Sequence, residues 1–256
     1  MDMTEQGRPE SVVVGIDGSH AALEAATWAV AEAANLGVPL RLLYVSAAEH
    51  TCRGPDNCGA VHAESVLHRA EMAVEGMGTR VRIDTAVVRG RPDCVLIDES
   101  RTAALVCVGS EGRGPCAPMP LGSTAAALVQ DAHCPVAIVR TAGGPQTSTG
   151  WIAAVRNDDP DNDAVVHRAM EEGRLRRAPV LLIDMRIDSW IRRYPDVHVE
   201  CVAARRGATR PSENYDSSIQ LAVVGSDDAK RLSQLVWPDY HPVLGDANQS
   251  VLLIRH

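Results

Sequence analysis

The sequence predicts an α/β protein built from two tandem domains, each a five-stranded parallel sheet flanked by helices. Two observations carry this prediction. Short apolar segments alternate with helical segments along the 256 residues, an order typical of parallel sheets. The pattern also restarts after a Gly-, Ser- and Thr-rich stretch at residues 141–150. We therefore expect one domain over residues 1–142 and a second over residues 150–256.

In the first half, near-continuous Val, Ile and Leu predict strands covered on both faces at residues 11–16, 40–46, 81–88, 104–108 and 136–140. Helical patterns lie between them at residues 20–36, 61–76, 91–101 and 123–132. Gly37 is a natural end for the first of these helices.

In the second half, strands are expected at residues 151–156, 180–185, 197–204, 219–224 and 251–255, and a helix at residues 163–177. The segment LVCVGS at 105–110 is echoed by LAVVGS at 221–226, and 136–140 is echoed by 251–255. These echoes indicate an internal duplication. The second copy is shorter, with little room for a counterpart of helix 61–76.

Charge and hydropathy exclude two classes of function. The formal net charge of -8 argues against a nucleic-acid surface, because phosphate binding needs clustered Lys and Arg. No apolar run approaches the roughly 20 residues that span a bilayer, and the first residues are polar and acidic. We expect a cytoplasmic protein that binds neither nucleic acid nor membrane.

Seven Cys are present, and most are expected to be buried free thiols, because Cys in apolar segments usually acts as a small hydrophobe. This expectation covers Cys94, Cys107, Cys134 and Cys201. Cys52 and Cys58 differ, since they lie in a Gly/Pro loop near His50 and His62. A zinc or redox site is the alternative there, but the spacing fits no compact zinc finger, so an exposed loop is expected.

The stretch VGSEGRGPCAPMPLGST, residues 108–124, runs from a predicted strand into a predicted helix. Its glycines are at positions 109, 112, 114 and 122, and Gly109 and Gly112 would let the backbone turn tightly and approach a ligand. The pattern is neither the Walker sequence nor the dinucleotide fingerprint, because no Lys follows Gly122 and the glycines do not close within six residues.

Gly122, Ser123 and Thr124 open the helix after this stretch, offering backbone N–H groups, two hydroxyls and the positive end of the helix dipole. An anion could bind between the two elements. The structural alternative is that Ser123 is only an N-cap and the glycines only form a loop.

A second candidate element, GIDGS at residues 15–19, follows the first strand. In an open parallel sheet, ligands bind beyond the carboxyl ends of strands where the strand order reverses. Asp17 and the glycine loop would share that crevice if the first and fourth strands are neighbours. The alternative for Asp17 is helix capping near Ser19.

These residues resemble the universal stress protein family. The spacing of Gly109, Gly112, Gly122 and Ser123 is similar to the family's nucleotide-binding signature, and GIDGS and HCPVAIVR (133–140) are similar to its opening and closing segments. The resemblance is close over residues 11–140 and fades afterwards. It implies Rossmann-like domains of strand order 3-2-1-4-5, in the tandem arrangement of actinobacterial members.

The resemblance further implies an adenine nucleotide, ATP with AMP or ADP as alternatives, accompanied by Mg²⁺ that bridges the phosphates. The phosphates would bind at Gly109, Ser110, Gly112, Gly114, Gly122, Ser123 and Thr124. Gly15 and Asp17 would lie on the ribose or adenine side, and the backbone of Val45 would receive the adenine edge. Arg113 would pair with phosphate, although an exposed Arg is more often only solvated.

Two departures from the family pattern affect these implications. Pro115, Pro118 and Pro120 stiffen the loop between Gly112 and Gly122, which could weaken nucleotide binding. In the second half, Asn157 replaces the acidic residue, and Asp227 and Asp228 follow Gly225 where they would repel phosphate, so no second nucleotide site is expected.

A nucleotide-binding regulatory protein is therefore the expected function. No nucleophile with an orienting base is evident, which argues against dedicated catalysis but leaves a slow ATPase open. The alternatives are an interaction module acting through dimer-like surfaces, which is the preferred interpretation of the second half, and an adenylate-transferring enzyme. The second half is expected to pair with the first through 136–140 and 251–255, and a homodimer of two chains is left open.

Overall fold

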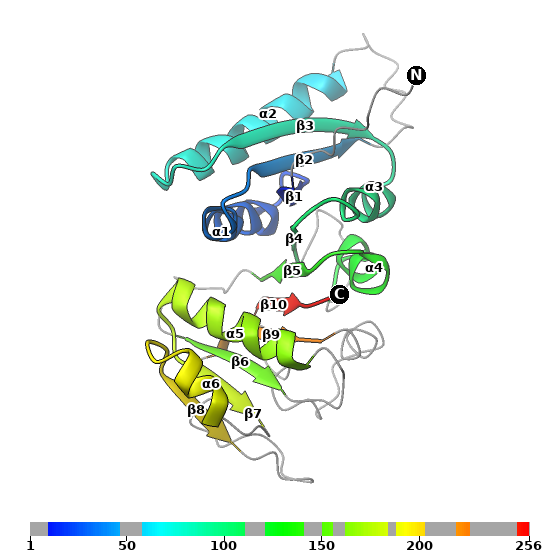
Figure 1. Ribbon diagram of the computed structural model, residues 1–256. Helices are drawn as coiled ribbons and strands as arrows, with labels where there is room; N and C mark the ends of the chain where they lie inside the picture. The colour runs from blue at the N-terminus through cyan, green and yellow to red at the C-terminus, as the bar shows by residue number, and fades with distance from the viewer. Residues whose placement is uncertain are drawn as a thin grey trace, which may run out of the picture.

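The computed structural model describes residues 10–46, 58–110, 121–140, 150–155, 162–183, 188–202, 219–225 and 250–255. Its helices and strands alternate in both halves of the chain (Figure 1). We call residues 10–140 the first half and residues 150–255 the second half. The division into domains at residues 142 and 150 stays a prediction, because residues 141–149 lie outside the described residues.

The elements of the first half match the predicted order. They are β1 (Val12–Ile16), α1 (His20–Leu36), β2 (Leu40–Ser46), α2 (Cys58–Glu75), β3 (Ile83–Arg89), α3 (Pro92–Glu99), β4 (Leu105–Gly109), α4 (Ser123–Asp131) and β5 (Val136–Val139). As expected, α1 ends at Gly37, whose φ of 67° is the left-handed conformation that favours glycine. Ser19 caps its other end by accepting a hydrogen bond from the backbone N–H of Ala22.

The second half repeats the strand pattern with a shorter helix after its second strand. Its elements are β6 (Trp151–Val155), α5 (Asn162–Arg176), β7 (Val180–Ile183), α6 (Asp188–Arg193), β8 (Val199–Val202), β9 (Ile219–Val224) and β10 (Ser250–Leu253). The helix α6 has 6 residues, against 18 in α2, the corresponding helix of the first half. The prediction that this position has little room is confirmed.

The ten strands of the described residues form one sheet in the order β3-β2-β1-β4-β5-β10-β9-β6-β7-β8. Each half therefore has the strand order 3-2-1-4-5, and every pairing within a half is parallel. The halves meet where β10 pairs antiparallel with β5, with Val251 opposite Ile138 (Figure 1). The predicted pairing of these two segments is confirmed, and it covers what would otherwise be two exposed sheet edges.

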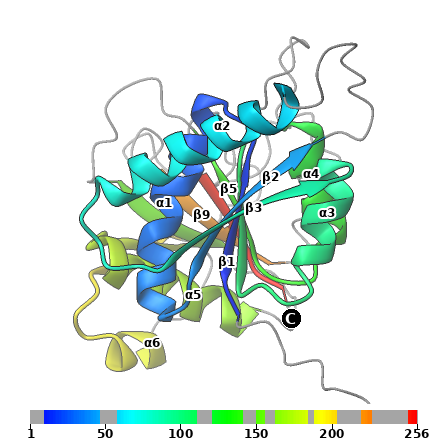
Figure 2. The ribbon, with the colours of Figure 1, turned by 90° about the horizontal axis from the view of Figure 1, so that it is seen from above.

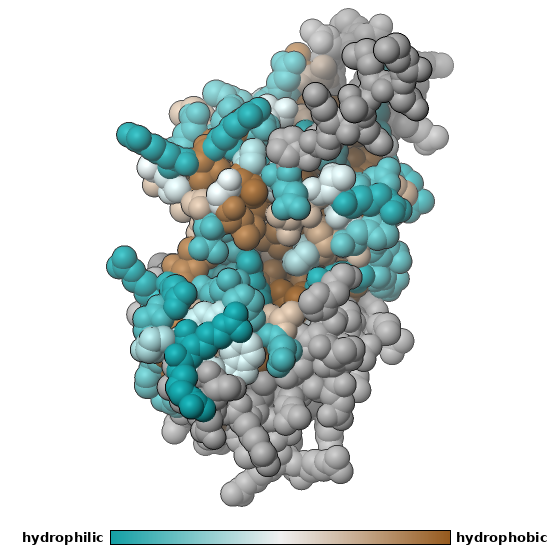
Figure 3. Space-filling model, viewed as in Figure 1, coloured by the Kyte–Doolittle hydropathy of each residue, from teal (hydrophilic) through white to brown (hydrophobic). Residues whose placement is uncertain are grey.

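Helices cover both faces of the sheet (Figure 2). One face packs against α1, α2 and α5, and the other packs against α3 and α4. Each apolar core runs through strands of both halves. On the side shown in Figure 3, hydrophobic residues gather near the level at which the halves meet. The junction between the halves is therefore part of the core.

Two expectations about cysteines are wrong. Cys94 and Cys201 are exposed, whereas Cys107 and Cys134 are buried as predicted. Cys58 begins α2 rather than lying in a loop, because the helix starts three residues before the predicted one. Cys52 and His50 lie outside the described residues, and no group of three His, Cys, Asp or Glu side chains that could hold a metal occurs among the described ones.

Within the described ranges, no helix is both long enough and apolar enough to cross a bilayer.

Candidate functional site

The turn after β1 is held by three hydrogen bonds. The backbone N–H of Ser19 donates to the Asp17 carboxylate at 2.8 Å, and Ser19 in turn caps α1. Arg69 from α2 donates to the carbonyl oxygen of Gly18, which has a φ of 84°. The N-cap of α1 is thus Ser19 and not Asp17. The carboxylate of Asp17 is fixed, half-buried, where β1 ends and α1 begins.

Gly109, at the end of β4, packs directly against the first turn of α1. A Cβ placed at Gly109 would lie 2.7 Å from both the Cβ and the carbonyl carbon of Ala21. Glycine is therefore required here by the close approach of a helix, whereas the sequence argument assigned it to the approach of a ligand. The contact of Gly109 with Ala21 places the GIDGS turn next to the start of the glycine-rich stretch. This proximity is what the predicted ligand crevice between Asp17 and the glycine-rich stretch requires.

The two ends of the glycine-rich stretch meet. The backbone N–H of Gly122 donates to the carbonyl oxygen of Ser110 at 2.9 Å, and the N–H of Ser110 donates to Val139 in β5 at 2.9 Å. Ser110 is buried, at 5% exposure. The start of α4 therefore lies beside the end of β4. Gly112, Arg113 and Gly114 lie outside the described residues, together with the three prolines of the loop.

The start of α4 has no capping side chain. Gly122 is the N-cap, in an extended conformation with φ of -61° and ψ of 153°, and Ser123 is the first helical residue. The alternative that Ser123 is the N-cap is thus wrong. Ser123 is exposed and Thr124 is half-buried. The first N–H groups of a helix lack intrahelical partners, so this end of α4 can bind an anion.

Val45 and Gly15 lie at the same edge of the sheet as Asp17. Ile16 of β1 is paired with Tyr44 of β2, which places Val45 one residue further along β2. Gly15 is tightly packed, since a Cβ there would lie 3.0 Å from the side chain of Leu96. The described candidate residues of β1, β2, β4 and α4 thus all lie at the carboxyl ends of neighbouring strands.

Comparison with known proteins decides the family. The model of the family described as "Universal stress protein family" matches residues 9–140, half of the chain. This protein belongs to the universal stress protein family. Universal stress protein Rv2624c of Mycobacterium tuberculosis is 40% identical over 99% of this chain and 100% of its own length. The similarity therefore extends through the second half.

Solved structures of other universal stress proteins are similar to this chain. A universal stress protein from Archaeoglobus fulgidus covers 96% of both chains with a TM-score of 0.67 at 15% identity, which supports the fold. A universal stress protein in complex with cAMP is 27% identical, with a TM-score of 0.41, and covers 52% of this chain and 98% of its own. That relative binds an adenine nucleotide.

In the second half of this universal stress protein, one residue that corresponds to a candidate site residue of the first half lies among the described residues. Gly225, buried, follows β9 as Gly109 ends β4. Asn157, Asp227 and Asp228, on which the absence of a second nucleotide site was predicted, lie outside the described residues. That absence stays a prediction.

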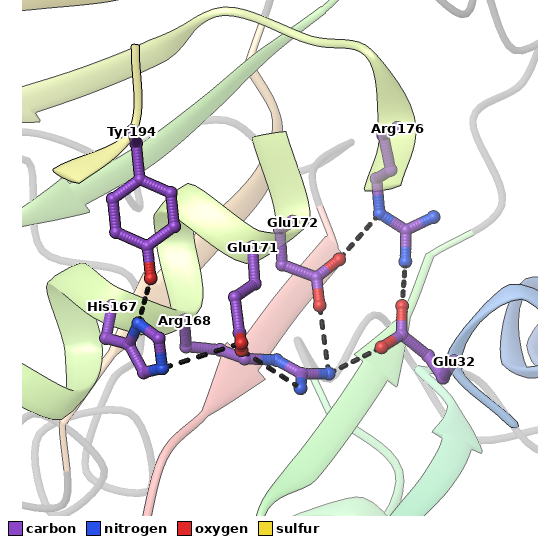
Figure 4. Close-up of polar contacts among 7 residues, drawn as sticks. All are labelled: Glu32, His167, Arg168, Glu171, Glu172, Arg176 and Tyr194. Atoms are coloured by element: carbon purple, nitrogen blue, oxygen red, sulfur yellow. Dashed lines mark hydrogen bonds and ion pairs between the residues drawn. The ribbon is translucent and has the colours of Figure 1, made fainter. Parts of the chain in front are cut away.

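Sequence reasoning missed a buried charge cluster between the halves of this universal stress protein, formed by Glu32, Arg168, Glu172 and Arg176 (Figure 4). Glu32 of α1 is 0% exposed and Glu172 of α5 is 1% exposed. Arg168 donates to Glu32 at 2.5 Å and lies 3.0 Å from Glu172. Arg176 donates to Glu172 at 2.8 Å and also to Glu32.

The cluster also contacts an aromatic ring. The guanidinium carbon of Arg176 lies 4.3 Å from the ring centroid of Trp28 on α1, a cation–π contact. The pKa of Glu32 is raised to about 8, first by burial and then by the nearby Glu172, while Arg176 and Arg168 oppose the increase. Two carboxyl groups and two guanidinium groups thus hold α1 of the first half to α5 of the second.

A sequence signal for this cluster exists. Glu32 follows the buried Ala25 and Ala29 at spacings of seven and three, so it lies on the apolar face of α1. Glu172 follows Val165 and Ala169 at the same spacings. A carboxylate at such a position is rarely buried unless it is paired. The sequence could therefore have indicated paired carboxylates, but not which cations they meet.

Proposed function

We propose that this universal stress protein binds one adenine nucleotide, ATP, in its first half, and acts as a regulatory protein without dedicated catalysis. The observation that carries the proposal is the hydrogen bond between Gly122 and Ser110, which brings the start of α4 beside the end of β4. The carboxylate of Asp17, held by the backbone N–H of Ser19, lies at the same edge of the sheet. A cytoplasmic location is part of the same proposal.

The phosphates would bind at the uncapped start of α4. Backbone N–H groups of Ser123 and Thr124 point along the helix toward its N-terminus, and the helix dipole favours negative charge there. The hydroxyl groups of both residues add donors. Among the described residues, no side chain of a capping residue occupies these N–H groups, so they are free to donate to phosphate oxygens.

The nucleoside would lie toward β1 and β2. Asp17 carries a carboxylate that can accept from ribose hydroxyls, and the backbone of Val45 can pair with the adenine edge, as the family resemblance implies. Gly112, Arg113 and Gly114 are proposed phosphate contacts as well. Mg²⁺ would be bound together with the nucleotide and would neutralise phosphate charge.

The hydrogen bonding of Ser19 argues against a role for its hydroxyl group as a nucleophile. Its hydroxyl oxygen accepts the N-cap hydrogen bond from Ala22 at 3.1 Å, so it serves the helix rather than an activating base. A slow ATPase remains the alternative, and turnover of labelled ATP distinguishes it from simple binding.

Gly122→Glu tests the site. The φ of -61° at Gly122 is accessible to any residue, so the new side chain does not strain the backbone, but its carboxylate would repel phosphate. ATP at about 100 times its Kd should raise the free energy of unfolding by about 2.7 kcal/mol, or Tm by roughly 5–10 °C. The variant should lose this increase.

Gly76→Glu is the matched control, because Gly76 is exposed at the end of α2 and receives the same charge. It should respond to ATP like the unmodified protein. If Gly122→Glu keeps the full ATP-dependent increase in Tm, the phosphates do not bind at α4 and the proposed site is wrong.

The second half has a different proposed role. The antiparallel pairing of β10 with β5 joins the halves edge to edge. We propose that the second half is a degenerate copy that completes this intrachain pair and binds no nucleotide itself. Whether two chains form a homodimer is tested by sedimentation at micromolar concentration.

A further inference from the structure

The last turn of α4 receives its hydrogen bonds from the far end of the chain. Nη1 of Arg255 donates to the carbonyl oxygen of Ala132 at 2.8 Å, and Nη2 donates to the carbonyl oxygen of Val129. Arg255 belongs to the second half and follows β10, whereas α4 belongs to the first half. A side chain of the second half therefore caps a helix of the first.

The hydrogen bonds from Arg255 replace a hydrogen bond that the carbonyl oxygen of Val129 lacks within the helix. In a longer helix, the carbonyl oxygen of Val129 would accept from the backbone N–H of His133. That N–H donates instead to the side chain of Ser100, the residue that follows α3, at 2.9 Å. Val129 is 1% exposed, so water is a poor substitute. Arg255 supplies the donor that the buried carbonyl group needs.

The sheet places Arg255 at this point. The strand β10 pairs antiparallel with β5, the strand that α4 leads into. Beyond β10, the N–H of Ile254 donates to Val224 in β9 at 2.9 Å, which extends the pairing to the residue before Arg255. The pairing of the two halves thus brings a cation to the C-terminus of α4, where it also complements the helix dipole.

We propose that Arg255 is a positioning residue for nucleotide binding, through which the degenerate second half holds α4, and this proposal rests on the proposed function. The helix has 9 residues, fewer than the roughly 12–15 at which an isolated helix becomes even marginally stable. Its order therefore depends on tertiary contacts, which are the packing of Ala125, Leu128 and Val129 in the core and the contacts at its ends. Arg255 secures the end opposite the one at which the phosphates bind.

The test measures ATP affinity by calorimetry on the full chain. Arg255→Ala should bind ATP roughly three- to tenfold more weakly, because the cap and its charge are lost. Arg255→Lys keeps a cation that can donate to the same carbonyl groups, and should restore most of the affinity. Unchanged affinity in Arg255→Ala would overturn the proposal, as would a loss that Lys fails to restore.

Leu252→Ala separates positioning from general stability. Leu252 is fully buried in β10, in the core on the face away from α4. This variant should lower Tm at least as much as Arg255→Ala, yet bind ATP within about twofold of the unmodified protein. If both variants lose affinity in proportion to their Tm, Arg255 contributes only to stability and the proposal fails.

Hydrogen exchange without nucleotide keeps the two proposals distinguishable. In Arg255→Ala, amides of α4, including that of Ala126, which donates to Gly122, should exchange faster than in the unmodified protein. Faster exchange supports the role of Arg255 even if the unmodified protein binds no ATP, a result that would refute the proposed function alone. Unchanged exchange would show that Arg255 does not hold α4.

Discussion

Replacing Glu32 with Gln removes the carboxylate that α1 contributes to the buried cluster and keeps the size of the side chain. Burial raises the pKa of this carboxyl group from its ordinary value of 4.5 to about 8. Near neutral pH the carboxyl group of Glu32 therefore carries a proton in the folded protein. Glu32 and Glu172 form a pair of neighbouring carboxyl groups. Gln resembles that protonated form.

The contribution of the Glu32 proton to the free energy of unfolding follows from the difference between the unfolded pKa of 4.5 and the folded pKa of about 8, at about 1.4 kcal/mol for each pH unit. It amounts to about 5 kcal/mol. Because the folded protein binds the proton more tightly than the unfolded chain, this stability is fully present below about pH 4.5. It is lost as the pH rises through about 8.

Denaturant unfolding between about pH 6 and pH 9, followed by circular dichroism, measures the effect. The unmodified protein should lose stability across this range as the carboxyl group is forced to ionise. Glu32→Gln should match the free energy of unfolding of the unmodified protein only below about pH 4.5, and should be the more stable protein by about 2 kcal/mol at pH 6 and by about 5 kcal/mol at pH 9. Its stability should lack this decline with pH.

Glu24→Gln is the matched control on the same helix. Its side chain is 34% exposed beside His20, so the substitution should change stability by less than about 0.5 kcal/mol across the range. A loss of about 3–5 kcal/mol at pH 6 in Glu32→Gln would refute the reasoning. Such a loss is what removing one partner of a fully ionised buried pair produces.

Three further predictions concern single residues. Gly109→Ala should lower the free energy of unfolding by roughly 1–3 kcal/mol in denaturant titrations, because the new methyl group meets the backbone of Ala21, and an unchanged value would contradict that packing. Ser19→Ala should cost about 1 kcal/mol through loss of the N-cap, measured in the same way. In the native protein at pH 8, iodoacetamide should label exposed Cys94 and spare Cys134, because burial raises the pKa of the Cys134 thiol to about 11. Mass spectrometry of tryptic peptides measures the labelling, and equal labelling of the two thiols would contradict the burial of Cys134.

Local patterns carried most of the fold prediction. Gly37 ended the first helix, and apolar segments bounded by turns gave all ten strands. The edge-to-edge pairing of β5 with β10 was also predicted, since repeated apolar segments at two sheet edges need cover. The boundaries were less accurate: α2 begins at Cys58, because a helix can extend through residues without a strong apolar pattern.

Contacts between distant residues were out of reach. The sequence pattern singled out Gly109. A glycine is required both where a ligand approaches the backbone and where helix α1 does, so the sequence could not distinguish the two causes. From the sequence, Arg255 is only the last residue of a predicted strand. Its contact with α4 becomes visible only in the folded sheet. The cluster around Glu32 depends on α5 meeting α1 across the junction, which periodicity within either helix does not encode.

Native mass spectrometry of the full chain with ATP counts the nucleotides that each chain binds. We expect one ATP for each chain, held in the first half, and the loss of that bound ATP in Gly122→Glu but not in Gly76→Glu. A second ATP for each chain would contradict the assignment of the second half. No bound ATP at millimolar concentration would contradict the nucleotide site itself.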